Sequence, residues 1–319
     1  MAGLPFDINA AFFTTARDAV GNCLAALGEK YEKMLVVTPD LDTTSRVQAF
    51  QERFPDRWYN VGIAEQDMFS FAAGLAHEGF KPVAFCFGSF ASMRSYEQIR
   101  TDICYGNVPV VIVANNAGYS NGVSGPTHCA LEDSALMSTC ANMTVIEPGD
   151  PKQIVKVLEA AMELNKPVYI RMGREATGSL YPDDVKYEIG KALIPREGND
   201  GAFICTGIMV HHAMAAAEKI KEETGKEIRV VDMHTIKPLD KEAVFDAAKT
   251  GRIVCAQDHN LIGGLGQMVG SALAEAGICC KLINRGCPDE FVPIANPDFL
   301  YARNGMDVDG LAAAMKSMF

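Results

Sequence analysis

The stretch Pro82-Val83-Ala84-Phe85-Cys86-Phe87 is a run of apolar residues with no alternation between polar and apolar side chains. Such a run is typical of a strand that is buried on both faces, as in a parallel sheet covered by helices. Segments with apolar residues three and four positions apart, at 65–77 and 151–164, predict helices. Further apolar runs resemble the first and lie at 34–37, 108–113, 143–146 and 167–170. The sequence therefore predicts an α/β unit built on a parallel sheet.

A second unit of the same kind follows a break in this pattern. The segment 174–201 is rich in glycine, proline and charged residues, which is typical of a linker. We expect two α/β domains, each a mainly parallel sheet flanked by helices, at residues 1–175 and 201–319, with a linker at 176–200. In the second domain, strands are expected near 203–206, 228–231, 253–256 and 280–283, and helices near 212–224, 241–249 and 266–276.

Composition argues against several classes of function. The net charge of -11 argues against nucleic acid, which requires clustered Lys and Arg. The start, Met1 to Asp7, has no basic region followed by an apolar core, and no apolar run approaches membrane-spanning length. The ten cysteines are scattered, with no Cys-x-x-Cys pair. We expect a cytoplasmic protein with reduced cysteines, no membrane contact and no metal site of its own.

Glu65 is the first candidate for chemistry. It stands at the start of the predicted helix 65–77, whose other residues are mostly apolar. Burying a carboxylate there costs free energy unless a ligand or a partner group satisfies it. The alternative is an acidic residue that the helix dipole favours in the first turn. The segment by itself leaves both interpretations open.

Five segments follow one another in an order known from one enzyme family. They are Gly62-Ile63-Ala64-Glu65-Gln66, Gly125-Pro126-Thr127-His128, Val168-Tyr169-Ile170-Arg171, Asp232-Met233-His234-Thr235-Ile236-Lys237-Pro238-Leu239 and His259-Asn260-Leu261-Ile262-Gly263-Gly264-Leu265-Gly266. With them the chain resembles the carboxy-terminal half of transketolase over nearly its whole length. The resemblance implies a pyrimidine-binding domain for thiamine diphosphate followed by a transketolase C-terminal-like domain. It indicates the cofactor class more strongly than the substrate.

The family's metal-binding segment is missing from the chain. Thiamine-diphosphate enzymes hold the diphosphate through Mg²⁺ on a Gly-Asp-Gly segment followed by Asn, and the nearest string here is Gly149-Asp150-Pro151. The resemblance therefore implies one subunit of a split transketolase. An N-terminal transketolase-like partner subunit is expected to carry the diphosphate-binding domain and the Mg²⁺, in an α2β2 assembly.

The resemblance also assigns residues to the cofactor. Glu65 is expected to be catalytic and to share a proton with N1′ of the aminopyrimidine. Phe87 matches the aromatic residue that stacks on that ring, and Asp40 matches an acidic residue beside the cofactor. Ile63, Met68 and Phe90 could form walls of the same pocket. The alternatives are a loop position for Asp40 and core packing for the apolar side chains.

Substrate contacts are implied at a second group of residues. His128 matches a catalytic histidine that contacts the sugar hydroxyls, and Arg17, Thr44 and Arg171 match three members of a sugar-phosphate clamp. Each could instead be structural or solvated. The chain departs from the family around this region: Asn116 replaces a phosphate-binding His, Val123 and Ser124 replace Glu-Asp, and Cys129 replaces Gln. Asn116 and Ser124 are therefore the substrate-binding candidates at the altered positions.

The function that the resemblance implies is transfer of a two-carbon ketol unit from a ketose to an aldose. The alternatives are a 2-oxoacid dehydrogenase beta-type subunit, a subunit similar to deoxyxylulose-phosphate synthase, and a non-catalytic subunit that keeps the fold. The altered loop at Asn116 and Ser124 suggests the last alternative, whereas the histidine loop and the string at 232–239 favour transketolase. The glycine loop 263–266 and the pair His211-His212 are interpreted as structural.

Overall fold

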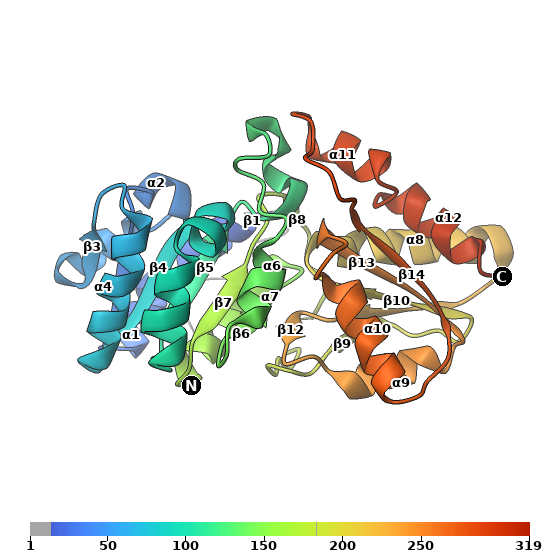
Figure 1. Ribbon diagram of the computed structural model, residues 1–319, viewed down its shortest axis with the longest axis horizontal. Coiled ribbons are helices and arrows are strands. Elements are labelled where there is room, and N and C mark those ends of the chain that lie inside the picture. Colours follow the sequence, from blue (N-terminus) through green and yellow to red (C-terminus); the bar gives the residue numbers. More distant parts are fainter. Residues whose placement is uncertain (1–13, 183) are drawn as a thin grey trace.

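The computed structural model describes residues 14–182 and 184–319, which form two α/β lobes side by side (Figure 1). The first lobe contains a seven-stranded sheet in the order β12-β6-β7-β5-β4-β2-β3, in which only β12 is antiparallel to its neighbour. Its own strands are β2 (Met34–Thr38), β3 (Trp58–Asn60), β4 (Lys81–Phe87), β5 (Val111–Asn115), β6 (Thr144–Ile146) and β7 (Val168–Arg171). The sequence prediction of a parallel α/β architecture is confirmed.

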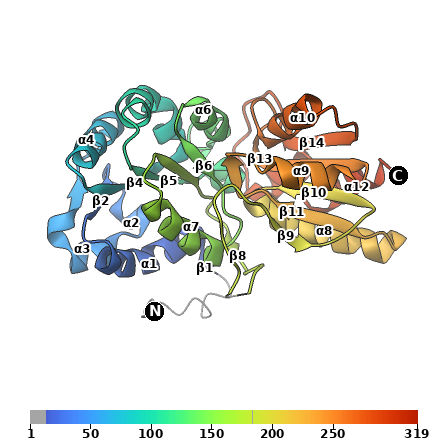
Figure 2. The ribbon, with the colours of Figure 1, turned by 90° about the horizontal axis from the view of Figure 1, so that it is seen from below.

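Helices cover both faces of the first sheet (Figure 2). One apolar core lies under α1 (Ala16–Lys30), α3 (Gln48–Arg53) and α7 (Pro151–Glu163). The opposite core lies under α4 (Glu65–His77), the π-helical segments η3 (Phe90–Arg94) and η4 (Ile99–Tyr105), and α6 (Asp133–Thr139). Successive side chains of a strand point to opposite faces, so both sets of positions must be apolar. Short segments complete the lobe: α2 (Asp42–Ser45), η2 (Pro55–Arg57), α5 (Tyr96–Gln98) and η5 (Gly118–Ser124).

The second lobe is built on a five-stranded sheet in the order β14-β13-β10-β11-β9, with β9 antiparallel at the edge. Its strands are β9 (Leu193–Arg196), β10 (Gly201–Cys205), β11 (Ile228–Asp232), β13 (Arg252–Asn260) and β14 (Lys281–Cys287). The helices on one face are α8 (Ile208–Thr224), α11 (Pro297–Arg303) and α12 (Val308–Lys316), and those on the other are α9 (Lys241–Ala248) and α10 (Leu265–Glu275).

Some helices and strands begin and end at the predicted residues, and others do not. Helix α4 spans the predicted residues, whereas β5 begins three residues later than expected and α8 begins four residues earlier. The stretch predicted as a linker contains β8 (Ala176–Thr177), which pairs with β1 (Thr14–Thr15), and β9, which joins the second sheet. Residues between the two lobes therefore take part in both of them.

The lobes are also joined by a strand that crosses from one to the other. Strand β12 (Thr235–Lys237) follows β11 of the second lobe but pairs antiparallel with β6 of the first sheet. The Lys237 ammonium donates to the carbonyl oxygens of Ser138 and Cys140, at 2.9 and 2.5 Å. The family-like string at 232–239 is thus the crossing between the two domains.

Side chains of the first lobe also enter the core of the second. Tyr119, Cys129 and Leu131 are buried in the cluster beneath α8 and α12. Segment η5, which carries Tyr119, packs on α11. The loops that follow β5 are therefore held between the two lobes.

No helix in the part of the chain that the structure describes is long and apolar enough to cross a membrane.

Candidate active site

The candidate residues gather at the carboxyl ends of the strands of the first sheet. Strands β3 and β4 lie on opposite sides of β2, so the chain changes direction across the sheet at this point. Ligands of open α/β sheets bind in the crevice at such a switch point. The loops after β2, β4 and β5 supply most of the residues described below.

Glu65 begins helix α4 and is 5% exposed. Its carboxylate accepts a hydrogen bond from the guanidinium of Arg94 at 2.6 Å. The Arg94 guanidinium also lies over the Phe90 ring, 4.2 Å from its centroid. A cavity of about 400 Å³ adjoins this pair and is lined by Ile63, Ala64, Glu65, Gln66, Asp67 and Arg94. The buried carboxylate therefore has a partner, which sequence reasoning did not single out.

Arg94 could not be paired with Glu65 from the sequence. The two residues lie 29 positions apart, and η3, which carries Arg94, is a π-helical segment whose side-chain spacing differs from that of an α-helix. The one available signal was a basic residue four positions after the aromatic Phe90. Ile63 is 79% exposed at the cavity wall, whereas Met68 is fully buried in the core and does not line the cavity.

Three rings connect the Glu65 cavity to a second cavity. The Phe87 and Phe90 ring centroids are 5.6 Å apart, and both rings face the His128 imidazole edge-on, at 6.1 and 5.3 Å. Phe87 ends β4, and His128 follows η5. The structure thus brings together the predicted aromatic residues and the predicted histidine.

The second cavity has a volume of about 320 Å³. It contains five of the predicted substrate residues together with one predicted cofactor residue, and its lining consists of Arg17, Thr44, Phe87, Asn116, Asn121, Ser124, His128 and Arg174. No carboxylate is among these lining residues. Burial and the nearby charge of Arg174 lower the pKa of Arg17. The cavity is therefore suited to an anion, which would offset the repulsion between the two guanidinium groups.

Polar groups in this cavity are available to a ligand. The side-chain oxygen of Asn116 is buried and has no hydrogen-bond partner, and Asn116 has a positive φ of 60° directly after β5. His128 Nδ1 is 2.8 Å from the Thr127 hydroxyl. Ser124 is exposed and donates to the Asn121 side-chain oxygen at 3.0 Å. A hydroxylated, anionic small molecule would find partners here.

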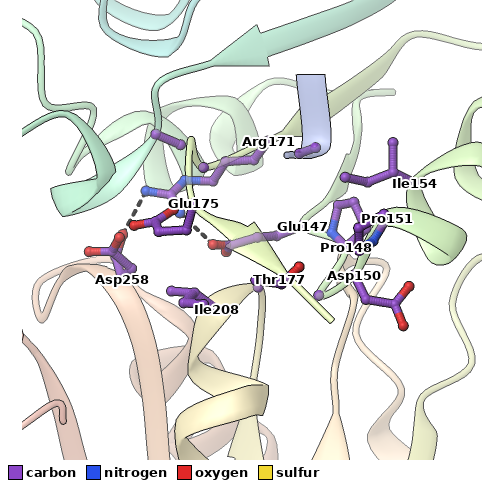
Figure 3. Close-up of a pocket in the computed structure, with 15 residues that line it drawn as sticks. Glu147, Pro148, Asp150, Pro151, Ile154, Arg171, Glu175, Thr177, Ile208 and Asp258 are labelled. Carbon is purple, nitrogen blue, oxygen red and sulfur yellow. Dashed lines mark hydrogen bonds and ion pairs between the residues drawn. The ribbon is translucent and has the colours of Figure 1, made fainter. Parts of the chain in front are cut away.

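Arg171 does not belong to this cavity, contrary to the sequence prediction. It is 1% exposed and forms an ion pair with Asp133 at 3.0 Å. A second ion pair, with Glu147, is shown in Figure 3. It also donates to the carbonyl oxygens of Ala130 and Asp258, at 2.8 and 2.7 Å. Burial alone would lower the pKa of Arg171, but the carboxylates raise it above its usual value. The guanidinium is committed to a buried ion-pair cluster between the lobes.

Arg174 takes the position that the sequence prediction gave to Arg171. It lines the cavity with Arg17 and donates to the Asn121 side-chain oxygen at 2.6 Å. Both arginines lie near the end of β7, and only the packing of the second lobe shows which one is enclosed. Asn121, the other lining residue that sequence reasoning missed, carries no motif of its own.

Asp40 lies at the edge of the site. It is exposed, has a φ of 63°, and lines neither of the two cavities. Its carboxylate accepts from the Asn60 amide at 3.2 Å, and the Asn60 side-chain oxygen accepts from the Gly62 backbone at 2.9 Å. Asp40 is therefore linked to the loop that leads into Glu65.

Two further features are accounted for by local contacts. The backbone N–H groups of Gly263 and Leu265, at the glycine loop, donate to Gln267 and Gln257, both at 2.8 Å. His211 and His212 bond to separate backbone carbonyl oxygens, at 2.9 and 2.8 Å. Within the described residues, no group of three or more His, Cys, Asp or Glu side chains could hold a metal ion.

The altered positions differ in their surroundings. Cys129 is buried in the core of the second lobe and does not line the cavity, and Val123 is exposed. Asn116 and Ser124 line the cavity. At the two altered positions that line the cavity, a ligand would therefore meet the neutral amide of Asn116 and the neutral hydroxyl of Ser124.

Comparison with known proteins covers both lobes. Residues 14–179 match the pyrimidine binding domain of transketolase, and residues 190–311 match the transketolase C-terminal domain. A protein described as a transketolase C-terminal section, from Methanocaldococcus jannaschii, is 38% identical over 93% of each chain. One of the subunits of the apulose-4-phosphate transketolase of Phocaeicola vulgatus is 34% identical over 92% of this chain and 94% of that one.

Longer proteins and solved structures are also similar. A 1-deoxy-D-xylulose-5-phosphate synthase of Clostridium perfringens is 36% identical over 91% of this chain, which spans about half, 47%, of that relative's length. A structure described as a split gene transketolase, inactive beta4 tetramer, superimposes with a TM-score of 0.86 at 35% identity, over 95% of this chain and 97% of that one. Transketolase of Campylobacter jejuni shares the fold, with a TM-score of 0.81 at 19% identity over 98% and 49% of the two chains.

Proposed function

Because the chain belongs to the transketolase family, we propose that it is the carboxy-terminal subunit of a split, thiamine-diphosphate-dependent enzyme that transfers a two-carbon ketol unit from a ketose to an aldose. The observation that carries the proposal is the arrangement of Glu65 at one cavity and His128 with two arginines at the next. The aromatic rings of Phe87 and Phe90 join the two cavities.

The residues at the first cavity fit the aminopyrimidine of the cofactor. A shielded carboxylate at a helix start can hold or share a proton with a ring nitrogen, and aromatic side chains nearby can cover a planar ring. The cofactor, when bound, supplies the carbon nucleophile of the reaction. Glu65 is the proton partner in this proposal, and Arg94 must move away from it to make room. Asp40, Ile63, Phe87 and Phe90 are the remaining cofactor-side residues.

The second cavity accounts for substrate binding. Arg17 and Arg174, with Thr44, would hold a phosphate or another anionic group of the sugar. His128 and the free side-chain oxygen of Asn116 would orient hydroxyl groups, and His128 can also move a proton. Ser124 is exposed at this cavity. Its neutral hydroxyl would tolerate an aldose substrate that carries a further negative charge.

The remainder of the site is assigned to a partner chain. Two relatives of similar length are described, one as a C-terminal section and the other as a single subunit of a transketolase, which supports a division of the enzyme between two chains. We propose an N-terminal transketolase-like partner that carries the diphosphate-binding domain and the Mg²⁺, in an α2β2 assembly. Such a partner would contribute the groups that this chain lacks.

The proposal is tested by measuring ketol transfer with the chain alone and with the product of its neighbouring gene. We expect thiamine-diphosphate-dependent transfer only when both chains are present, and we expect Glu65→Gln to remove it while the complex still assembles. Activity of the chain by itself would contradict the split enzyme. A second candidate, suggested by the 36% identity to 1-deoxy-D-xylulose-5-phosphate synthase, predicts formation of 1-deoxy-D-xylulose 5-phosphate by the same complex.

A further inference from the structure

Residues of the second lobe hold segment η5, which lines the substrate cavity. Gly118, the first residue of η5, has a φ of 63°, and a Cβ at this position would overlap the Asp258 carboxylate. That carboxylate, on β13 of the second lobe, accepts from the Tyr119 backbone N–H with both oxygens, at 3.0 and 2.9 Å. Only glycine permits both the backbone conformation and the close approach. The N-terminal end of η5 is therefore fixed by a side chain of the other domain.

Helix α11 holds the same segment from a second direction. The Tyr301 ring packs on the Tyr119 ring with centroids 5.6 Å apart, and the Asn304 amide donates to the Tyr119 hydroxyl at 2.6 Å. A Cβ at Gly122 would be only 2.5 Å from the Leu300 side chain. Segment η5 thus lies against α11 with no space between them.

Two residues of η5 connect these contacts with the second lobe to the cavity. Asn121 and Ser124 both line the cavity, and the side-chain oxygen of Asn121 accepts from Arg174 at 2.6 Å and from Ser124 at 3.0 Å. The Asn121 amide donates to the His128 carbonyl at 3.4 Å. A shift of η5 would therefore displace an arginine and the loop that carries the proposed catalytic histidine.

The Tyr301 hydroxyl, which lies beside the Asp258 anchor of η5, has more hydrogen-bond acceptors near it than it has hydrogens. The Tyr301 hydroxyl lies 2.8 Å from a carboxylate oxygen of Asp258 and 2.8 Å from one of Glu175. A phenol has a single hydrogen, so it can donate to only one of them. The other short contact is a hydrogen bond only if that carboxyl group is protonated and donates to the phenol oxygen. The geometry requires one proton in addition to that of the phenol.

The surroundings favour retention of that proton. Burial raises the pKa of Asp258 to about 7, and it also raises the pKa of Glu175. The Tyr301 phenol stays protonated because burial raises its pKa well above the usual value. Two ionised carboxylates on one hydroxyl would repel each other and leave one of them without a donor.

We propose that Asp258 and Glu175 share one proton besides that of the Tyr301 hydroxyl between them, and that this triad acts as the positioning device for η5 and Arg174 in the substrate cavity. The second lobe then has a role in substrate binding without contacting the substrate. Loss of the proton releases the Asp258 carboxylate from Tyr301, and η5, whose Tyr119 N–H is anchored on Asp258, loosens. The effect on substrate binding rests on the proposed function of the cavity, whereas the effect on η5 does not.

Other charged or titratable groups face the triad from the elements packed around it. Arg171 remains charged, because its carboxylate partners raise its pKa. Burial raises the pKa of the Cys129 thiol to about 12 and raises that of Cys287 as well, so both stay neutral. Tyr119, whose pKa burial also raises, and His212, whose ring packs edge-on against Tyr301 at 5.2 Å, also face the triad, whereas Glu132 and Glu290 act on the neighbouring Cys287.

Three variants separate the shared proton from simple packing. Asp258→Asn mimics the protonated acid, because its oxygen can accept from Tyr119 while its amide donates to the phenol oxygen. Tyr301→Phe removes only the hydroxyl. Tyr31→Phe is the matched control: it removes a tyrosine–carboxylate hydrogen bond of 2.5 Å to Glu163, at the far end of helix α1 from Arg17.

Hydrogen exchange of the full chain, measured by mass spectrometry and corrected for intrinsic rates, reports on η5 directly. We expect protection of residues 118–125 to fall about tenfold in Tyr301→Phe, as for loss of a hydrogen bond to a charged group, and to be unchanged in Tyr31→Phe. In the wild type, protection should fall between about pH 6 and about pH 8, and in Asp258→Asn it should not. A pH dependence that persists in Asp258→Asn, or full protection in Tyr301→Phe, overturns the proposal.

Kinetics of the complex with the partner chain supply the second readout. If the cavity binds substrate, KM for a phosphorylated ketose should rise in Tyr301→Phe more than kcat falls, and Asp258→Asn should keep at about pH 8 the KM that the wild type has at about pH 6. Altered protection of η5 without a change in KM would overturn the link from η5 to the substrate. If the variants alter the hydrogen-exchange protection of η5 but the wild-type complex shows no ketol transfer, only the proposed function would be contradicted.

Discussion

Replacement of Arg171 by methionine tests whether this residue serves the fold or the substrate. Methionine keeps much of the length of the side chain and removes the guanidinium. The change leaves the carboxylates of Asp133 and Glu147 buried without their cation, and it removes the donors to the carbonyl oxygens of Ala130 and Asp258. All of these groups lie at the boundary between the two lobes.

The expected cost follows from the burial of every partner. Arg171 and Asp133 are essentially inaccessible, and Glu147 is nearly so, so solvent cannot compensate for the lost ion pairs. Breaking a buried pair by removing one partner costs about 3–5 kcal/mol. If the free energy of unfolding falls by about 3 kcal/mol per M urea, near the upper end of the range for small proteins, the urea concentration at the unfolding midpoint should fall by roughly 1–2 M.

The assay is urea unfolding followed by circular dichroism, with two comparison variants. Arg53→Met removes an exposed ion pair to Glu29, which should cost at most about 1 kcal/mol. Arg174→Met removes a guanidinium from the substrate cavity and should also leave the midpoint nearly unchanged. If Arg171→Met were as stable as these two variants, its assignment to the buried ion-pair cluster would be refuted.

Four further predictions concern the site and the pH dependence of stability. Arg174→Met should raise KM of the complex for a phosphorylated sugar by roughly 10- to 100-fold, as expected for lost hydrogen bonds to a charged group, and an unchanged KM would place the phosphate elsewhere. Glu65→Gln should lower kcat of the complex by at least about 100-fold with no loss of assembly in sedimentation experiments. Arg94→Gln should tighten thiamine diphosphate binding by about 2- to 5-fold in calorimetry, because a half-exposed competitor of the cofactor is removed; weaker binding would show that Arg94 supports the cofactor. Burial raises the pKa of Asp232 to about 7, so its stabilising contribution is complete below about pH 4 and is lost as the pH rises through about 7; the urea midpoint of Asp232→Asn should therefore vary less between about pH 6 and about pH 8 than that of the wild type.

The sequence predicts best those elements whose signal is local and repeated. Helix α4 follows from its apolar periodicity, and the buried strands β4 and β7 follow from continuous apolar runs. Both signals depend on one segment and its immediate burial. The gathering of Glu65, Phe87 and His128 follows from the rule that the loops at the carboxyl ends of parallel strands meet. Both kinds of inference use regularities that any α/β sheet must satisfy.

Features that depend on distant packing were not predicted. Strand β12 has the length of a short loop, and nothing in its three residues indicates that it pairs with β6 across the domain boundary. Arg171 and Arg174 are the same residue type three positions apart, and only the approach of Asp258 and Glu147 shows which is enclosed. The sequence thus indicates the types of side chain at a site, but the partner domain decides which of them face the ligand.

The position of η5 has a consequence for how the chain can be divided. A fragment that ends at the predicted boundary near residue 175 would keep Glu65, His128 and Arg17, yet it would lose Asp258, Tyr301 and the β12 strand. The edge of β6 would then be unpaired, and Tyr119 would lose both its backbone acceptor and its packing partner. The substrate cavity is therefore a property of the two lobes together, although every side chain that lines it comes from the first.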